Sequence, residues 1–254
     1  MKVAIVGATG FVGRELGIAL VRAGHEVTAL VRNVDRAKLD LPFPCKVHRF
    51  DPADEPALTE NLAGHDAVVN LAGEGIQDKP WSQDRIRALY DSRTQPTSAI
   101  VRALTKLKES GKSPAVLVNA SAIGFYGDRG DETIDENSAP GAGLLPDICK
   151  EWELAATKNL PDHVRLVILR IGVVLGHGGG MLGKVLPIFR GGAAGNLGSG
   201  RQWLAWIHMD DLVQMILWSL TNTKASGIYN ATAPEPATNA AFTHRSCHRP
   251  PPSR

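Results

Sequence analysis

Residues 3–13 read Val-Ala-Ile-Val-Gly-Ala-Thr-Gly-Phe-Val-Gly, a short apolar run followed by glycines at Gly7, Gly10 and Gly13. The apolar run is typical of a buried parallel strand, and residues 14–23 have the apolar spacing of an amphipathic helix. A strand that turns through glycines into a helix directs backbone N–H groups and the positive end of the helix dipole at one point. The stretch therefore predicts a dinucleotide-binding turn inside a βαβ unit.

The glycines of this turn have separate roles. Gly7 permits the tight turn, Gly10 lets the backbone approach a pyrophosphate, and Gly13 lets the helix pack closely on the strand. The residues between them that we expect to contact the cofactor are Thr9, Phe11 and Val12. The alternative is a tight strand-to-helix turn that binds no ligand.

Strands and helices alternate along the rest of the chain. Expected strands are 26–31, 46–50, 66–71, 115–120, 164–171 and 227–231, and expected helices are 56–62, 82–107 with an interruption near Pro96, 147–158 and 210–221. This alternation predicts an α/β fold, a Rossmann-type doubly wound parallel sheet with ligands at the carboxyl ends of its strands. We expect one domain over residues 1–242, with segments of a substrate lobe at about 172–206 and 232–242.

Composition excludes several classes of partner. With 254 residues, 43% of them hydrophobic, the chain can bury a large core, and a net charge of +2 gives no reason to expect nucleic acid. No apolar run reaches the ~18 residues of a membrane span. Cys45, Cys149 and Cys247 are too scattered for a disulfide framework or a zinc site. We expect a cytoplasmic protein, or one of an organelle stroma if a transit peptide was removed, whose partner is a small molecule; the oligomeric state cannot be read from the chain.

Cofactor choice depends on the end of the second strand, where an acid would bind the ribose 2′-hydroxyl of NAD and repel a 2′-phosphate. Arg32 holds that place and Arg36 follows one helical turn later, so the sequence favours NADP(H). The alternative is a pair of solvated loop arginines. Asp51, past the third strand, is placed to meet the adenine amino group, and the residues that end the fourth strand where the cofactor would cross are Asn70, Leu71, Ala72 and Gly73. Each of these is as often a strand-terminating turn residue as a ligand contact.

Further motifs narrow the assignment. Residues 119–127 read Asn-Ala-Ser-Ala-Ile-Gly-Phe-Tyr-Gly, residues 170–176 read Arg-Ile-Gly-Val-Val-Leu-Gly, and residues 206–212 include Trp-Ile-His and Asp-Leu. Together with the glycine turn, they resemble the extended and atypical short-chain dehydrogenases/reductases, and in particular the epimerase-family proteins labelled nucleoside-diphosphate-sugar epimerases or SulA-like cell-division inhibitors. The resemblance implies an NADP-binding Rossmann fold. Some relatives in photosynthetic organisms are linked to cell or plastid division.

Catalysis in that superfamily uses a Tyr-x-x-x-Lys pair on the helix after the fifth strand, with a Ser or Thr at the strand end. The Lys lowers the pKa of the Tyr and holds the ribose, so that the phenol can exchange a proton with substrate. Lys150 stands at the expected position, but Pro146 occupies the position of the Tyr. Ser121 and Tyr126 are the remaining candidates for a hydrogen bond to a substrate oxygen. The alternatives are a strand cap for Ser121, a packed loop aromatic for Tyr126 and an exposed helix lysine for Lys150.

The last third of the chain carries two further patterns. His208 lies close to Asp211, but we favour a strand that runs into a helix capped by Asp210 or Asp211 over a catalytic base. The glycines at 178–180 are interpreted as a source of flexibility where substrate enters, and less as a second phosphate cradle. Residues 243–254 form a basic, proline-rich tail that should be disordered. It replaces the helices with which relatives continue, so we expect a substrate lobe shortened by truncation or a shifted reading frame.

Two functions follow from these residues. The first is an NADP(H)-dependent oxidoreductase or epimerase-like enzyme acting on a small carbonyl or sugar-nucleotide-like substrate. The second is a non-catalytic NADP-binding regulator, such as a redox sensor or a division-related protein, which the missing Tyr favours. The fold alone does not decide between them.

Overall fold

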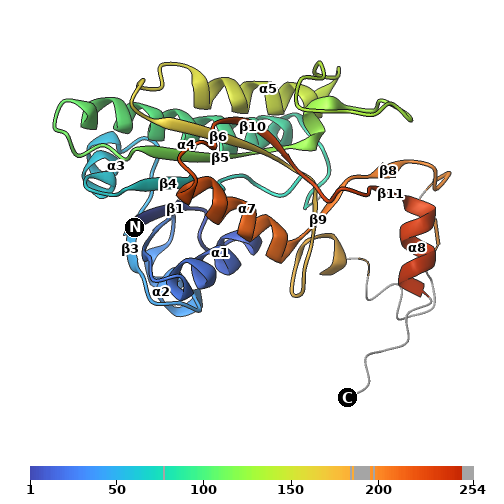
Figure 1. The fold of residues 1–254 in the computed structure, drawn as a ribbon, viewed down its shortest axis with the longest axis horizontal. Coiled ribbons are helices and arrows are strands. Elements are labelled where there is room, and N and C mark those ends of the chain that lie inside the picture. Colours follow the sequence, from blue (N-terminus) through green and yellow to red (C-terminus); the bar gives the residue numbers. More distant parts are fainter. Residues whose placement is uncertain (77, 184, 186–194, 197, 248–254) are drawn as a thin grey trace.

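Seven parallel strands form the centre of the protein in a computed structural model that describes residues 1–76, 78–183, 185, 195–196 and 198–247. The order across the sheet is β10-β6-β5-β4-β1-β2-β3 (Figure 1). The strands are β1 (Lys2–Val6), β2 (Glu26–Val31), β3 (Lys46–Arg49), β4 (Ala67–Asn70), β5 (Val116–Ala122), β6 (Arg165–Ile171) and β10 (Gly227–Ala231). The prediction of a doubly wound parallel sheet is confirmed.

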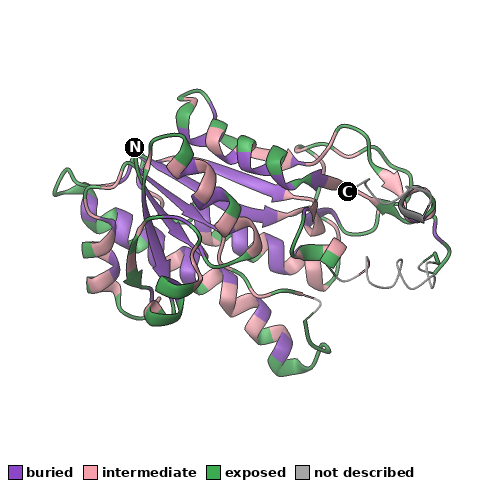
Figure 2. Ribbon diagram, turned by 90° about the horizontal axis from the view of Figure 1, so that it is seen from below, coloured by how far each residue is buried: buried purple, intermediate pink, exposed green. Residues whose placement is uncertain are grey.

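Helices cover both faces of the sheet. One face carries α1 (Phe11–Arg22), α2 (Val34–Asp40) and α7 (Met209–Thr221), and the other carries α3 (Glu55–Leu62), α4 (Gln83–Lys108) and α5 (Leu144–Thr157) (Figure 1). Successive residues of a strand point to opposite faces. In β1, Ile5 packs in the core beneath α1 and α7, whereas Ala4 packs in the core beneath α3 and α4. Both faces are therefore buried, as the purple strands of Figure 2 show.

The strand order reverses between β1 and β4. From β1 the chain proceeds outward through β2 and β3, and it then returns to β4 on the other side of β1 before it continues through β5, β6 and β10. In this class of fold the loops diverge at such a reversal, and ligands bind between them at the carboxyl ends of the strands. The glycine turn after β1 and the Asn70–Gly73 segment after β4 meet there.

Helix α4 corrects one prediction. We expected an interruption near Pro96, but α4 runs unbroken from Gln83 to Lys108 with Pro96 buried inside it. Proline removes one backbone hydrogen bond from a helix interior. The residues that follow, including the fully buried Ile100 and Leu104, pack against the sheet and hold both halves in line. Tertiary packing thus outweighs the local cost of the proline.

Short elements form a lobe beyond the carboxyl edge of the sheet. β7 (Val173–Leu175) pairs with β9 (Trp206–His208), and β8 (Trp203–Leu204) pairs with β11 (Ala237–Thr238). The chain then enters α8 (Asn239–Cys247) (Figure 1). Residues 243–247, which we expected to be disordered, are therefore helical, and the rest of the predicted tail lies outside the described residues. Among the described helices, none is long and apolar enough to cross a membrane.

Candidate functional site

The turn between β1 and α1 has a shape that requires its glycines. Gly7 has a φ of +88°, and a Cβ added there would lie 2.9 Å from the carbonyl oxygen of Leu71. A Cβ on Gly13 would lie 2.2 Å from the carbonyl oxygen of Gly7, closer than any real contact. Gly10 begins α1 without a side chain to occupy the first helical N–H groups, and its own N–H donates to the Gly7 carbonyl over 3.0 Å. The turn therefore offers an open, glycine-lined cradle with the geometry that suits a pyrophosphate.

The end of β2 presents arginines to solvent. Arg32 is exposed and makes no ion pair or hydrogen bond with any residue that the structure describes. Asn33 caps α2, since its side chain accepts a hydrogen bond from the Arg36 N–H over 3.0 Å. The Arg36 guanidinium is 80% exposed and lies 3.1 Å from Asp40. Arg32 is thus available to an incoming anion, whereas Arg36 must share its charge with Asp40.

The end of β3 borders a hollow. The carboxylate of Asp51 accepts a hydrogen bond from the Ala53 N–H over 3.0 Å and lies 3.5 Å from the Arg49 guanidinium. Asp51 lines a hollow of about 500 Å³ together with Pro52, Ala53, Thr94, Gln95, Ser98 and Arg102. The hollow lies between the segment that follows β3 and helix α4. The contact of Asp51 with an adenine stays a prediction.

Asn70, which ends β4, is fully buried and its amide is used inside the protein. It donates to Thr97 over 2.8 Å and to Asn119 over 2.7 Å, and its oxygen accepts from the Ala72 N–H over 3.2 Å. The last of these bonds is the pattern of a turn residue that shapes its own backbone. Asn70 therefore holds Leu71, Ala72 and Gly73 in position, and any contact from this segment to a ligand falls to those three residues.

Ser121 and Tyr126 belong to one buried polar network. Ser121 donates to Glu153 over 2.6 Å, and the Glu153 carboxylate binds Arg170 through two contacts of 2.9 Å each. Arg170 also donates to the Tyr126 hydroxyl over 2.9 Å, and that hydroxyl donates to Asn230 over 2.6 Å. Burial opposes the charge of Arg170, but the hydrogen bonds to Glu153 and Tyr126 outweigh it and raise the pKa of the guanidinium. Both candidate hydroxyls are thus engaged within the protein.

Lys150 lies apart from this network. It is on α5, and its ammonium group pairs with the Asp147 carboxylate over 2.6 Å. No contact joins Lys150 to Ser121 or Tyr126 among the described residues. Pro146 lies in the first turn of α5, where a missing N–H costs nothing because those groups have no partner within the helix. The structure therefore joins two of the three predicted catalytic residues and leaves the third separate.

Comparison with known proteins places this geometry in a family. The chain matches the NAD dependent epimerase/dehydratase family over residues 3–232. It belongs to that family. The chloroplastic SDR39U1 homolog of Arabidopsis thaliana, an epimerase family protein, is 41% identical over 237 residues, which are 93% of this chain and 67% of the relative. The epimerase family protein Mb2239 of Mycobacterium bovis is 38% identical over 98% of this chain and 80% of its own length.

A solved structure extends the family match to three dimensions. The crystal structure of human epimerase family protein SDR39U1 with NADPH has a TM-score of 0.82 and 34% identity to this chain, covering 95% of this chain and 77% of the other. The predicted resemblance to epimerase-family, short-chain dehydrogenase/reductase proteins is confirmed. A nicotinamide cofactor is thus the ligand of the family to which the glycine cradle belongs.

The start of α7, directly after β9, differs from our prediction. We expected Asp210 or Asp211 to cap the helix, but His208 is the cap and its Nδ1 accepts from the Asp210 N–H over 3.2 Å. His208 takes this role because its backbone is still extended, so α7 begins one residue earlier, at Met209. The interpretation of His208 as part of a helix start, and not as a catalytic base, agrees with this contact.

The glycines after β7 contact Phe11 on α1. A Cβ on Gly176 would lie 3.1 Å from the Phe11 ring, one on Gly179 would lie 2.6 Å from it, and one on Gly180 would lie 2.8 Å from it. These residues are glycines because the backbone packs directly on an aromatic ring beside the phosphate turn. Packing accounts for Gly179 and Gly180, whereas Gly178 has a φ of +80° and no neighbour within 4 Å of an added Cβ among the described residues. Flexibility of this segment stays a prediction.

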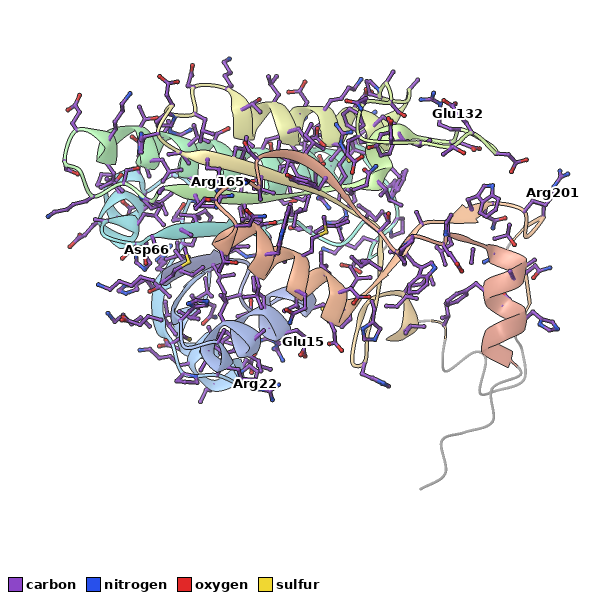
Figure 3. The ribbon with its side chains drawn as sticks, viewed as in Figure 1. Glu15, Arg22, Asp66, Glu132, Arg165 and Arg201 are labelled. Carbon is purple, nitrogen blue, oxygen red and sulfur yellow. The ribbon has the colours of Figure 1, made fainter. Side chains whose placement is uncertain are left out.

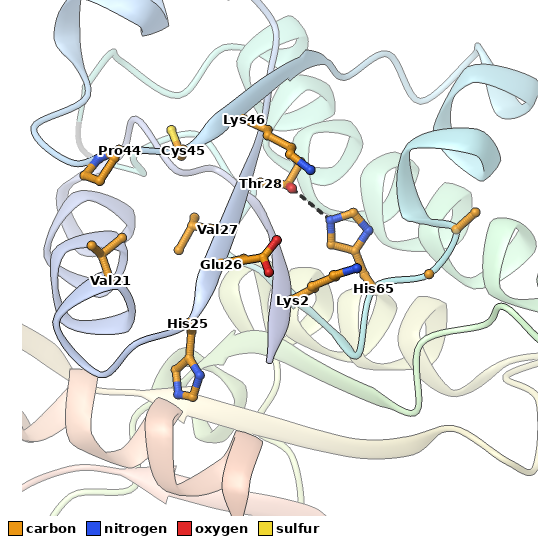
Figure 4. A pocket seen from close by; sticks show the side chains of 12 residues that line it. Lys2, Val21, His25, Glu26, Val27, Thr28, Pro44, Cys45, Lys46 and His65 are labelled. Atoms are coloured by element: carbon orange, nitrogen blue, oxygen red, sulfur yellow. Dashed lines mark hydrogen bonds between the residues drawn. The ribbon is translucent and has the colours of Figure 1, made fainter.

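A second hollow, of about 460 Å³, lies at the opposite edge of the epimerase-family fold (Figure 4). It is formed at the amino ends of β1, β2 and β3, where His65 contacts the hydroxyl of Thr28 over 2.8 Å. Cofactors of doubly wound folds bind at the carboxyl ends of the strands. This hollow is therefore at the opposite end of the strands from the glycine turn.

Sequence reasoning missed Glu153, Arg170 and Asn230. One signal was present: Arg170 interrupts the otherwise apolar stretch of β6, and a charge within a buried strand requires a charged partner. No local pattern identified Glu153 as that partner, because it lies on α5.

Proposed function

We propose that this epimerase-family protein binds NADP(H) in the crevice between the ends of β1 and β4. The pyrophosphate would lie on the cradle from Gly7 to Gly13, the adenine would lie beside Asp51, and Arg32 with Arg36 would bind the 2′-phosphate. The observation that carries the proposal is Arg32, an exposed guanidinium at the end of β2 where an NAD site has an acid. The NADPH in human SDR39U1 supports the same choice.

We further propose a reductase or epimerase-like reaction on a small carbonyl or sugar-nucleotide-like substrate. The bound nicotinamide supplies hydride transfer, and the protein has to hold and move the accompanying proton. Tyr126 is the phenol at the carboxyl end of β5, and Arg170 donates to its oxygen. Tyr126 would have to release Asn230 before its proton could reach a substrate.

A non-catalytic NADP-binding regulator is the second candidate. Two observations favour it: Pro146 replaces the usual Tyr, and the hydroxyls of Ser121 and Tyr126 already have partners within the protein. In such a protein the same crevice would report the ratio of NADPH to NADP⁺. A role related to cell or plastid division belongs to this second candidate.

Titration calorimetry with NADPH and NADH tests the cofactor proposal. We expect NADPH to bind at least about tenfold more tightly, since a bidentate Arg–phosphate contact is worth 1.5–3 kcal/mol or so. Arg32→Asp should remove that preference, whereas Arg22→Asp, the same charge change in the last turn of α1, should retain it (Figure 3). Equal affinities for the two cofactors in the unmodified protein would refute the role of Arg32.

A screen of nicotinamide absorbance separates the two candidate functions. Turnover of NADPH with a carbonyl or sugar-nucleotide substrate, lost in Tyr126→Phe while NADPH still binds, supports the enzyme. An epimerase-like reaction returns the hydride to its substrate and is followed by the appearance of the epimer, so NADPH binding with neither loss of NADPH nor a new epimer across the screen supports the regulator.

A further inference from the structure

Glu74, the residue after the Asn70–Gly73 segment, is held to helix α4 at several points. Its N–H donates to the Ser92 hydroxyl over 3.2 Å, and its carbonyl oxygen accepts from the Arg93 guanidinium over 2.8 Å. Its carboxylate is bound by Arg85, which also donates to the Gly75 carbonyl. We call Glu74 and these three α4 residues the Glu74 clamp. The backbone and the side chain of one loop residue are therefore both fixed.

The two arginines of the Glu74 clamp are buried at some energetic cost. Arg85 is 6% exposed and Arg93 is 9% exposed. Arg93 has no carboxylate within ion-pair distance among the described residues, and its charge lies 5.2 Å from the ring centre of Trp152. Burial lowers the pKa of Arg93, which is the signature of a charge held away from water. A buried guanidinium is costly unless most of its donors find acceptors, and here the Glu74 and Gly75 carbonyls supply two of them. The Nε of Arg85 has no acceptor among the described residues, so any loss of these loop contacts would leave more of its charge unpaired.

The Glu74 clamp packs against one side of the loop that follows β4. A Cβ on Gly73 would lie 3.3 Å from the Arg93 guanidinium carbon, and on the other side the Leu71 carbonyl lies against Gly7 of the phosphate turn. Residues 71–75 thus lie between two buried arginines and the glycine cradle, with Gly73 and Gly75 exposed to solvent. A small shift of either arginine would move the loop relative to the cradle.

The order of the strands assigns a half of the cofactor to this loop. Arg32 and Asp51 lie at the ends of β2 and β3, on the adenine side of the strand reversal. A dinucleotide that crosses the reversal extends its other half over the ends of β4 and β5. The loop that the Glu74 clamp holds is the one on that second side.

We propose that Arg85 and Arg93 are positioning residues for the nicotinamide half of NADP(H). They fix residues 73–75 so that the end of β4 can receive the nicotinamide ribose, and they contribute little to binding of the adenine half. This inference rests on the proposed NADP(H) site. Its test must therefore separate the two halves of the cofactor.

Calorimetry with NADPH and with adenosine 2′,5′-bisphosphate makes this separation. The second ligand has the adenine and the 2′-phosphate but no nicotinamide. In Arg93→Lys, which keeps the charge but loses the planar fork, we expect the Kd for NADPH to rise about tenfold while that for the bisphosphate changes less than about twofold. Arg87→Lys, an exposed residue of the same helix, is the matched control and should change neither.

Ser92→Ala provides a milder variant should Arg93→Lys fold poorly. It removes the acceptor of the Glu74 N–H and a weaker contact to Arg93, together with a hydrogen bond to the Leu89 carbonyl within α4, and it keeps both arginines. We expect about a threefold rise in the Kd for NADPH alone. Equal losses for both ligands, or no loss for either, would overturn the inference and leave the NADP(H) site in place. A wild-type protein that binds neither ligand would overturn the proposed function and this inference with it.

Discussion

Glu153→Gln is expected to destabilise the protein strongly, because it leaves a buried cation without its counter-charge. Arg170 is 2% exposed and receives both of its carboxylate contacts from Glu153, at 2.9 Å each. Removing one partner of a buried ion pair costs about 3–5 kcal/mol. Ser121 also changes its acceptor from a carboxylate to an amide. A domain is stable by only about 5–15 kcal/mol, so the loss is a large part of the total.

Urea denaturation followed by circular dichroism measures this loss at pH 7. For a chain of this size each kcal/mol shifts the melting temperature by roughly 2–4 °C, so a fall of about 10 °C is expected as well. Glu151→Gln, an exposed neighbour on α5, is the control and should stay within about 0.5 kcal/mol of the wild type.

The double variant Glu153→Gln/Arg170→Met tests the reason for the loss. If an uncompensated charge causes it, removal of the charge should restore part of the stability, since an apolar pair can replace a buried ion pair. A loss below about 1 kcal/mol for Glu153→Gln alone would refute the reasoning.

Three further outcomes follow from the structure. Gly13→Ala should abolish nucleotide binding and cost about 1–3 kcal/mol by overpacking, because its Cβ would lie 2.2 Å from the Gly7 carbonyl oxygen. Gly183→Ala is the control and should do neither, since an added Cβ there meets no described atom within 4 Å. Nucleotide binding by Gly13→Ala would contradict this expectation. Burial lowers the pKa of His65, so the unfolded chain takes up a proton before the folded protein does as the pH falls past about 6.5. The free energy of unfolding should therefore decrease on acidification. Urea unfolding between pH 7.5 and 5 measures this loss, which should be smaller in His65→Gln. Burial, together with the charge of Glu153, raises the pKa of the Cys149 thiol to about 11, so iodoacetamide at pH 8 should leave Cys149 unmodified in the native protein and modify it after unfolding, as mass spectrometry would show.

The sheet could be predicted because its strands carry local signals. β2 and β10 have the bounds that the sequence indicates, and β1 falls on the apolar run before Gly7, since each is a short, mainly apolar or β-branched segment between polar or glycine residues. Pro96 misled the prediction of α4 because the packing that carries the helix through the proline comes from distant strands. Similarly, the short strands of the lobe have too few residues to show a period.

In the candidate site, too, the residues that are close together in the sequence were predicted, and those that are far apart were not. The glycine cradle and Arg32 lie within one βαβ unit, so spacing along the chain was sufficient to find them. The network around Tyr126 is assembled from distant segments: Asn230 is 104 residues away and Arg170 is 44 residues away. Asn70 was predicted as a cofactor contact from its position at the end of β4. The sequence could not show that its amide points inward and donates to Thr97 and Asn119.

The network has a consequence for synthesis on the ribosome. When a nascent chain has emerged only through α5, the Glu153 carboxylate has no cation to meet, because Arg170 lies on β6, which is made later. The hydrogen bond from the Tyr126 hydroxyl to Asn230 forms later still, after β10 has been made. The first βαβ unit, which holds the phosphate turn, can therefore pair its strands while the chain is being made, although its outer face is covered only when α7 follows. The region around Tyr126 closes only after the last strand of the sheet has been released.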